Sequence, residues 1–105
     1  MVKTNLEIKG FLTFLILHEI KYKPLTGDQL ASRIGNRKNA KLTPGTIYPP
    51  LKQLRELKLV YVDQIGREKY YSMTKEGKIE LENLYIQFSN YFYGLKNQIR
   101  KERLK

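Results

Sequence analysis

The stretch that decides the fold is Leu42-Thr43-Pro44-Gly45-Thr46-Ile47-Tyr48-Pro49-Pro50-Leu51-Lys52-Gln53-Leu54. Thr43 is a good N-cap and a proline suits the first helical position, so the stretch predicts a helix from residue 44 to about 58. Its apolar residues recur on one side, at Ile47, Leu51, Leu54 and Leu57. Because prolines lack an amide donor, we expect the helix to bend or tighten at Pro49-Pro50.

Two helices are predicted before this stretch. Thr4 and Glu7 have the spacing of a capping box, and the apolar periodicity behind them predicts a helix over about 6–22. The same spacing recurs from Thr26 and predicts a short helix over about 27–35.

Beyond the third helix the periodicity changes. Two β-rich runs joined at Gly66 predict a hairpin over about 60–73 with a basic tip and with Tyr71 in the core beneath it. Three helices followed by a hairpin is the winged helix-turn-helix order. The prediction is therefore a mainly α fold of the α+β class, with a winged helix-turn-helix domain over 1–73.

The remaining segment, 74–105, is predicted to form one long helix capped by Thr74. Apolar side chains lie on more than one side of it, and one small domain cannot cover them all. We therefore expect a homodimer formed through this helix. The predicted dimerisation residues are Leu81, Leu84, Tyr85, Phe88, Tyr91, Phe92, Leu95 and Ile99.

More than half of the net positive charge lies in one quarter of the chain. The 105 residues carry a net charge of +10, and residues 33–58 alone hold seven bases and one acid. Duplex DNA is the natural complement of such a stretch. The other interpretation is a solvated basic face that favours solubility.

Composition also excludes several classes of protein. The absence of Cys rules out disulfides and thiolate metal sites and fits a reducing, cytoplasmic setting. With one His and no Gly-rich phosphate loop, an enzyme is the weakest class, and we expect no catalytic residue, metal or cofactor. The apolar run around Ile16 is far shorter than the roughly 20 residues of a membrane span, so no membrane partner is expected.

Three motifs together resemble PadR-type transcriptional regulators of the short kind with a single C-terminal helix. They are Leu25-Thr26-Gly27-x-x-Leu30, the stretch over 42–54, and Lys69-Tyr70-Tyr71-x-Met73-Thr74-x-x-Gly77, and their order and spacing agree over residues 8–80. The chain departs from the family at Asp28, where an aromatic residue is usual, and at the second proline, Pro50.

The resemblance implies a homodimeric, sequence-specific regulator of transcription that binds double-stranded DNA, and we expect a repressor. It places the third helix in the major groove and the wing on the backbone or in the minor groove. The C-terminal region and the first helix of such dimers can enclose a small aromatic effector. Half-sites about one helical turn apart are expected if both third helices meet one face of the duplex.

The predicted DNA contacts come from the third helix, the segment before it and the wing. Thr46 and Gln53 can both donate and accept, as base-edge recognition requires, while Lys52 suits a phosphate. Arg67 at the wing tip is a candidate for the minor groove, and its alternative is an exposed loop base. The full set is Arg37, Lys38, Lys41, Thr43, Gly45, Thr46, Tyr48, Pro49, Lys52, Gln53, Arg67 and Lys69.

Some of these residues also have a purely structural interpretation. Thr43 can serve only as a cap, Tyr48 can pack on the helix surface, and His18 is most simply a packed or partly exposed helix residue. Two other functions also remain open: a nonspecific architectural DNA-binding protein, and a winged helix that binds another protein.

Overall fold

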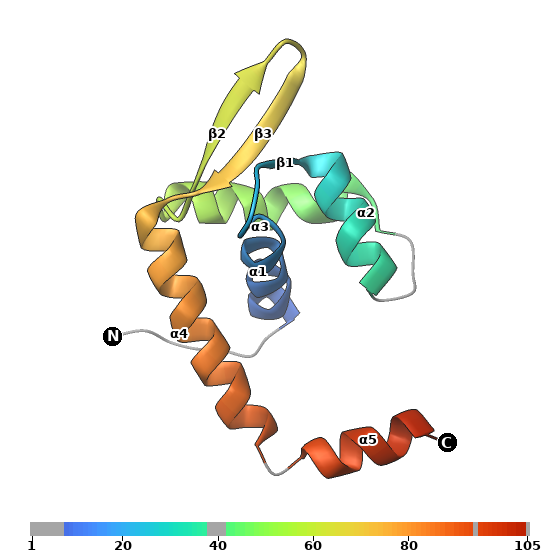
Figure 1. Ribbon diagram of the computed structural model, residues 1–105. Coiled ribbons are helices and arrows are strands. Elements are labelled where there is room, and N and C mark those ends of the chain that lie inside the picture. Colours follow the sequence, from blue (N-terminus) through green and yellow to red (C-terminus); the bar gives the residue numbers. More distant parts are fainter. Residues whose placement is uncertain (1–7, 38–41, 94, 105) are drawn as a thin grey trace.

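The computed structural model describes residues 8–37, 42–93 and 95–104, and its elements follow the predicted order (Figure 1). They are α1 (Ile8–Glu19), β1 (Leu25–Thr26), α2 (Gly27–Arg37), α3 (Pro44–Glu56), β2 (Val60–Ile65), β3 (Glu68–Met73), α4 (Lys75–Phe92) and α5 (Lys96–Leu104). The winged helix-turn-helix prediction is confirmed. None of the helices in these ranges is long and apolar enough to cross a membrane.

Side-chain caps explain where two of the helices begin. At α2 the amide of Gln29 donates to Thr26 Oγ1 over 3.1 Å, and the amide of Thr26 donates to Gln29 Oε1 over 2.9 Å. This reciprocal pair is the predicted capping box. At α4 the amide of Gly77 donates to Thr74 Oγ1 over 2.9 Å, as that cap was expected to do. The capping box at residues 4–7 lies outside the described residues.

A third strand, which the sequence did not predict, completes the sheet. The strand order is β1-β3-β2, and all pairing is antiparallel. Tyr71 lies at the centre, opposite Leu25 on β1 and Val62 on β2. Because β1 ties the start of α2 to the base of the wing, the hairpin and the helices share one core.

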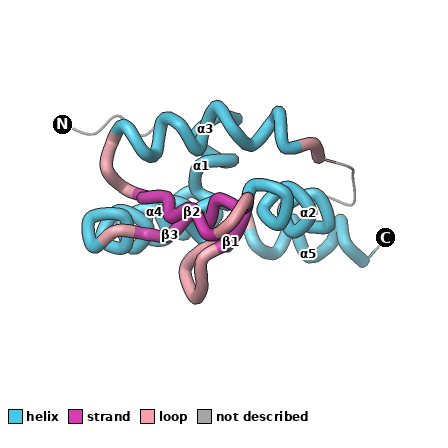
Figure 2. The backbone as a smooth tube through the Cα atoms, turned by 90° about the horizontal axis from the view of Figure 1, so that it is seen from above, coloured by secondary structure: helices cyan, strands magenta, loops and turns pink. Residues whose placement is uncertain are grey.

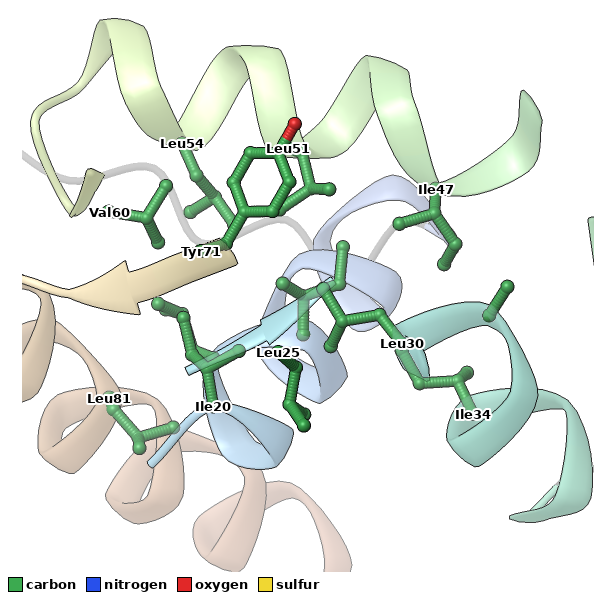
Figure 3. Close-up of a cluster of buried hydrophobic side chains, with 13 residues drawn as sticks. Ile20, Leu25, Leu30, Ile34, Ile47, Leu51, Leu54, Val60, Tyr71 and Leu81 are labelled. Atoms are coloured by element: carbon green, nitrogen blue, oxygen red, sulfur yellow. The ribbon is translucent and has the colours of Figure 1, made fainter. Parts of the chain in front are cut away.

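The core is filled by the apolar stripe of α3 together with residues from α1, α2 and the sheet (Figure 3). Ile47, Leu51 and Leu54 are at most 1% exposed, and Tyr71 points from β3 toward α3. The prediction that Leu57 belongs to this stripe is wrong, since Leu57 is 59% exposed. The reason is local: α3 ends at Glu56, before its periodicity reaches Leu57.

Helix α3 passes through Pro49 and Pro50 without interruption. They are the sixth and seventh residues of a helix that starts at Pro44, beyond the four amides that lack an intrahelical partner, so each proline removes one backbone hydrogen bond from the second turn. The helix stops short of residue 58, where Lys58 adopts a left-handed conformation with φ 61°.

The C-terminal segment, predicted as one continuous helix, is divided into α4 and α5. Tyr93 has the extended angles φ −63° and ψ 132° and ends α4. The next residue in the sequence is Gly94, a poor helix former. The prediction of one helix was wrong because the apolar periodicity continues on both sides of this glycine. As Figure 1 shows, α4 runs away from the wing and α5 lies at the opposite end of the molecule.

The end of α3 and the start of α4 are joined by hydrogen bonds, and we call this contact the α3–α4 joint. The hydroxyl of Thr74 donates to the carbonyl oxygen of Lys58 over 2.8 Å, and its amide donates to the carbonyl oxygen of Leu59 over 3.0 Å. A Cβ on Gly77 would overlap that same Leu59 oxygen and lie 2.8 Å from Met73 Cγ. Only glycine therefore fits at this position.

We expect Gly77→Ala to lower the free energy of unfolding by about 2–3 kcal/mol, because a backbone carbonyl has to move. Gly45→Ala is the matched control, since the nearest atom to its added Cβ is Thr43 Oγ1 at 3.7 Å. That control should be neutral or mildly stabilising, as alanine is in a helix. Urea unfolding of both variants checks the prediction, and equal stability would contradict it.

Candidate nucleic-acid interface

The outer face of α3 gathers the predicted contact residues. Burial of the opposite stripe fixes the rotation of the helix about its axis, so that the other side meets solvent. The exposed residues on this side are Gly45, Thr46, Tyr48, Pro49, Lys52, Gln53 and Glu56. All except Glu56 were predicted contacts, and the structure places these residues together.

Five of them also line one concavity. A groove of about 580 Å³ runs along α3, with Leu12 of α1 on its other wall. The residues of α3 that border it are Thr46, Pro49, Pro50, Lys52, Gln53 and Glu56. Hydroxyl, amide, ammonium and carboxylate groups thus face a common space, which allows one extended ligand to meet several of them at once.

The N-terminus of α3 presents a pair of hydroxyl groups. Thr43 has the extended backbone of an N-cap, with Pro44 in the first turn, but its side chain does not accept from an amide of the helix. Its Oγ1 instead lies 3.3 Å from Thr46 Oγ1, and both residues are exposed. The prediction of a cap is thus confirmed for the backbone alone, and the hydroxyl faces outward.

The wing carries its bases at the far end of a projecting hairpin (Figure 1). Gly66 has φ 63°, a left-handed conformation that glycine adopts without strain, and Arg67 follows it in the turn. Arg67 and Lys69 are both exposed. Figure 2 shows α3 along one side of the molecule with the strands beside it, so the helix and the wing flank a shared surface.

The pKa of the buried Tyr71 responds to two residues of this surface. Burial raises the pKa of Tyr71, the nearby Tyr48 raises it further, and the guanidinium of Arg55 acts in the opposite direction. Tyr71 itself is 5% exposed, as predicted, whereas Arg55 is exposed at the edge of α3. Arg55 is a basic group of this surface that the predicted contact set omitted.

Part of the basic stretch is not on this surface. Arg33 lies 3.8 Å from the buried carboxylate of Glu19 and so joins α2 to α1. Of Arg37 the structure describes the backbone, at the end of α2. Lys38 and Lys41 lie outside the described residues.

The predicted dimerisation residues divide into two groups. Leu81 and Phe88 are buried within the chain, and Leu84 and Tyr85 pack partly against its core. Those still exposed are Tyr91, Phe92, Leu95 and Ile99, each 43–51% exposed. Ile79 and Ile86 form a second exposed stripe on α4, and Tyr93, just past the end of α4, is also exposed.

Aromatic rings attach α4 to α1. Phe14 stacks on Phe88 with their centroids 4.3 Å apart, and it meets the edge of Tyr85 at 5.4 Å. His18 Nδ1 lies 2.5 Å from the Tyr85 hydroxyl, so His18 is a packed residue of this contact. Phe11 and Phe92 extend the cluster at its open end, where they are 39% and 45% exposed.

A helix pair whose second helix exposes polar and basic groups, followed by a two-stranded wing with exposed bases near its tip, defines the class of winged helix-turn-helix DNA-binding proteins. A family model for the PadR-like family of transcriptional regulators matches residues 16–83, so the chain belongs to that family. This makes it a DNA-binding regulator of transcription.

Solved structures support the same fold. A PadR-like regulator from Bacillus cereus is 24% identical with a TM-score of 0.78, covering 88% of this chain and 94% of its own. A putative regulator from Thermoplasma acidophilum is 24% identical with a TM-score of 0.70, covering 95% and 96%. A PadR-like factor from Bacteroides fragilis is 20% identical with a TM-score of 0.72, covering 85% and 90%. A search of curated proteins found no match.

Proposed function

We propose that this protein is a homodimeric repressor that recognises a specific sequence in duplex DNA. In this proposal α3 enters the major groove and the wing rests on the backbone or in the minor groove. The observation that carries it is the outer face of α3, where hydroxyl, amide and basic groups are exposed together beside a hairpin with exposed bases near its tip.

The chemistry of that face suits base recognition. A helix about 10–12 Å wide fits a major groove about 12 Å wide. Thr46 and Gln53 can donate to and accept from base edges, whereas Lys52 and Lys69 offer charge to phosphates. A surface for a protein partner would favour apolar or acidic groups here, and Glu56 is the one acid exposed on α3.

Selection of bound fragments from a random duplex pool, at stated salt, tests this function. We expect enrichment of a two-fold symmetric site, because a dimer presents two α3 helices. Equal binding to all fragments would indicate an architectural protein, and no binding would indicate a protein-interaction module. A reporter whose promoter overlaps the enriched site should lose expression, and a gain would contradict the repressor role.

Lys52→Ala should weaken binding to every duplex by a similar factor and reduce the salt slope by about one unit, because one phosphate contact is lost. Lys78→Ala is the control, since Lys78 is an exposed lysine of α4 that is outside the predicted contact set. Titrations of the enriched and a random duplex at several salt concentrations provide the measurement. An unchanged slope would remove Lys52 from the phosphate contacts.

We propose that the second copy covers Tyr91, Phe92, Leu95 and Ile99. These side chains are apolar, exposed and continuous with the aromatic cluster that joins α1 to α4. The half-exposed rings of Phe11 and Phe92 at the open end of that cluster would then border a cavity between the two copies. Such a cavity suits a planar aromatic effector, which stacks favourably on aromatic side chains.

Leu95→Glu should convert the dimer to a monomer in sedimentation equilibrium, because it buries an unpaired charge in the interface. Ile86→Glu tests the alternative stripe on α4, and Ile65→Glu, at the wing, is the control. Dissociation by Ile86→Glu alone would place the interface on the other stripe. The dye anilinonaphthalene sulfonate should fluoresce with the wild type and not with the monomer, and equal fluorescence would contradict a cavity between the copies.

A further inference from the structure

The first residue of α2 lies against a side chain of α3. Gly27 is buried, and a Cβ placed on it would lie 3.0 Å from both Cε1 and the hydroxyl oxygen of Tyr48, and 3.1 Å from its Cζ. Carbon atoms pack comfortably at about 3.5–4.0 Å. A side chain at position 27 would therefore require the outer end of the tyrosine ring to give way by a few tenths of an ångström.

The neighbour of Gly27 determines what a larger residue would do. At Gly77 the added Cβ would meet the backbone of Leu59, which cannot move without disturbing the fold. At Gly27 it would meet only the end of a side chain that is 49% exposed. Tyr48 can swing into solvent, so the change at Gly27 would move the ring and leave the core in place.

The position that the ring holds now is well defined. Tyr48 extends from the outer face of α3 to the start of α2, and its phenol is close enough to Tyr71 to raise the pKa of that buried hydroxyl. The start of α2 is itself held by the Thr26–Gln29 capping box and by pairing of β1 with β3. The ring thus rests on a rigid support.

We propose that Gly27 is a positioning residue for DNA recognition, because its missing side chain lets the ring of Tyr48 rest on α2 and holds its hydroxyl on the surface that α3 offers to DNA. This inference rests on the proposed function. It adds a residue that does not itself touch DNA. A contact side chain that is already ordered in the free protein loses less entropy on association, and binding is stronger as a result.

Gly27→Ala should weaken binding to the selected duplex about fivefold, the middle of the range that ordering one side chain spans. The probe is the duplex enriched from the random pool, titrated at fixed salt, with a random duplex of equal length beside it. Ser32→Ala is the matched control, since Ser32 is exposed on the same helix. Equal affinity of Gly27→Ala and the wild type would overturn the proposal.

A double-mutant cycle separates positioning from a general effect on the fold. With Tyr48→Ala present, adding Gly27→Ala should cause no further loss of affinity, because the ring it displaces is gone. A loss that persists in the Tyr48→Ala background would overturn the proposal. If Gly27→Ala also lowers the melting temperature, Tyr48→Ala should restore it, and failure to do so would count against the contact in the same way.

One measurement does not depend on DNA. Three-bond couplings that report χ1 of Tyr48 should show one rotamer in the wild type and averaging in Gly27→Ala. If the wild type binds no duplex, the proposed function fails, and the rotamer still decides whether Gly27 positions Tyr48. The same Tyr48 rotamer in both proteins would overturn the inference even where duplex binding is confirmed.

Discussion

Burial of Ile47, Leu51 and Leu54 sets the rotation of α3 about its axis, and the rest of the recognition surface depends on that rotation. These side chains pack against α1, α2 and the sheet, and Tyr71 points toward α3 from β3 (Figure 3). A turn of one residue, about 100°, would carry the basic and hydroxyl groups of α3 off its outer face. The apolar side of the helix therefore determines which polar groups are available to DNA.

Much of this arrangement follows from local sequence. The capping box at Thr26 and the cap at Thr74 predicted where α2 and α4 begin, because each uses hydrogen bonds within four residues. The apolar spacing of α3 predicted its buried side. Alternation and Gly66 predicted the wing, since a left-handed turn is a local requirement of a tight hairpin.

Features that depend on distant partners were not predictable. Strand β1 is two residues long and exists because Leu25 and Thr26 pair with β3, more than forty positions away in the sequence. Burial of Phe88 on Phe14 of its own chain, which withdraws it from a surface for a second copy, was likewise not predictable. The contact of Gly27 with Tyr48 also depends on residues that are distant in the sequence. Its only trace in the sequence is a glycine at the predicted start of a helix.

The α3–α4 joint has a consequence for how motion travels through the molecule. Thr74 links the carbonyl oxygens of Lys58 and Leu59 to the first turn of α4, so a tilt of α4 acts on α3 at its C-terminal end. The N-terminal end of α3 is held separately, through Tyr48 against α2. The two ends of α3 are thus attached to different helices, the N-terminal part to α2 and the C-terminal end to α4. In the proposed complex with DNA, a ligand or partner that shifts α4 would act first on the C-terminal end of α3, the end farther from Thr46 and Tyr48.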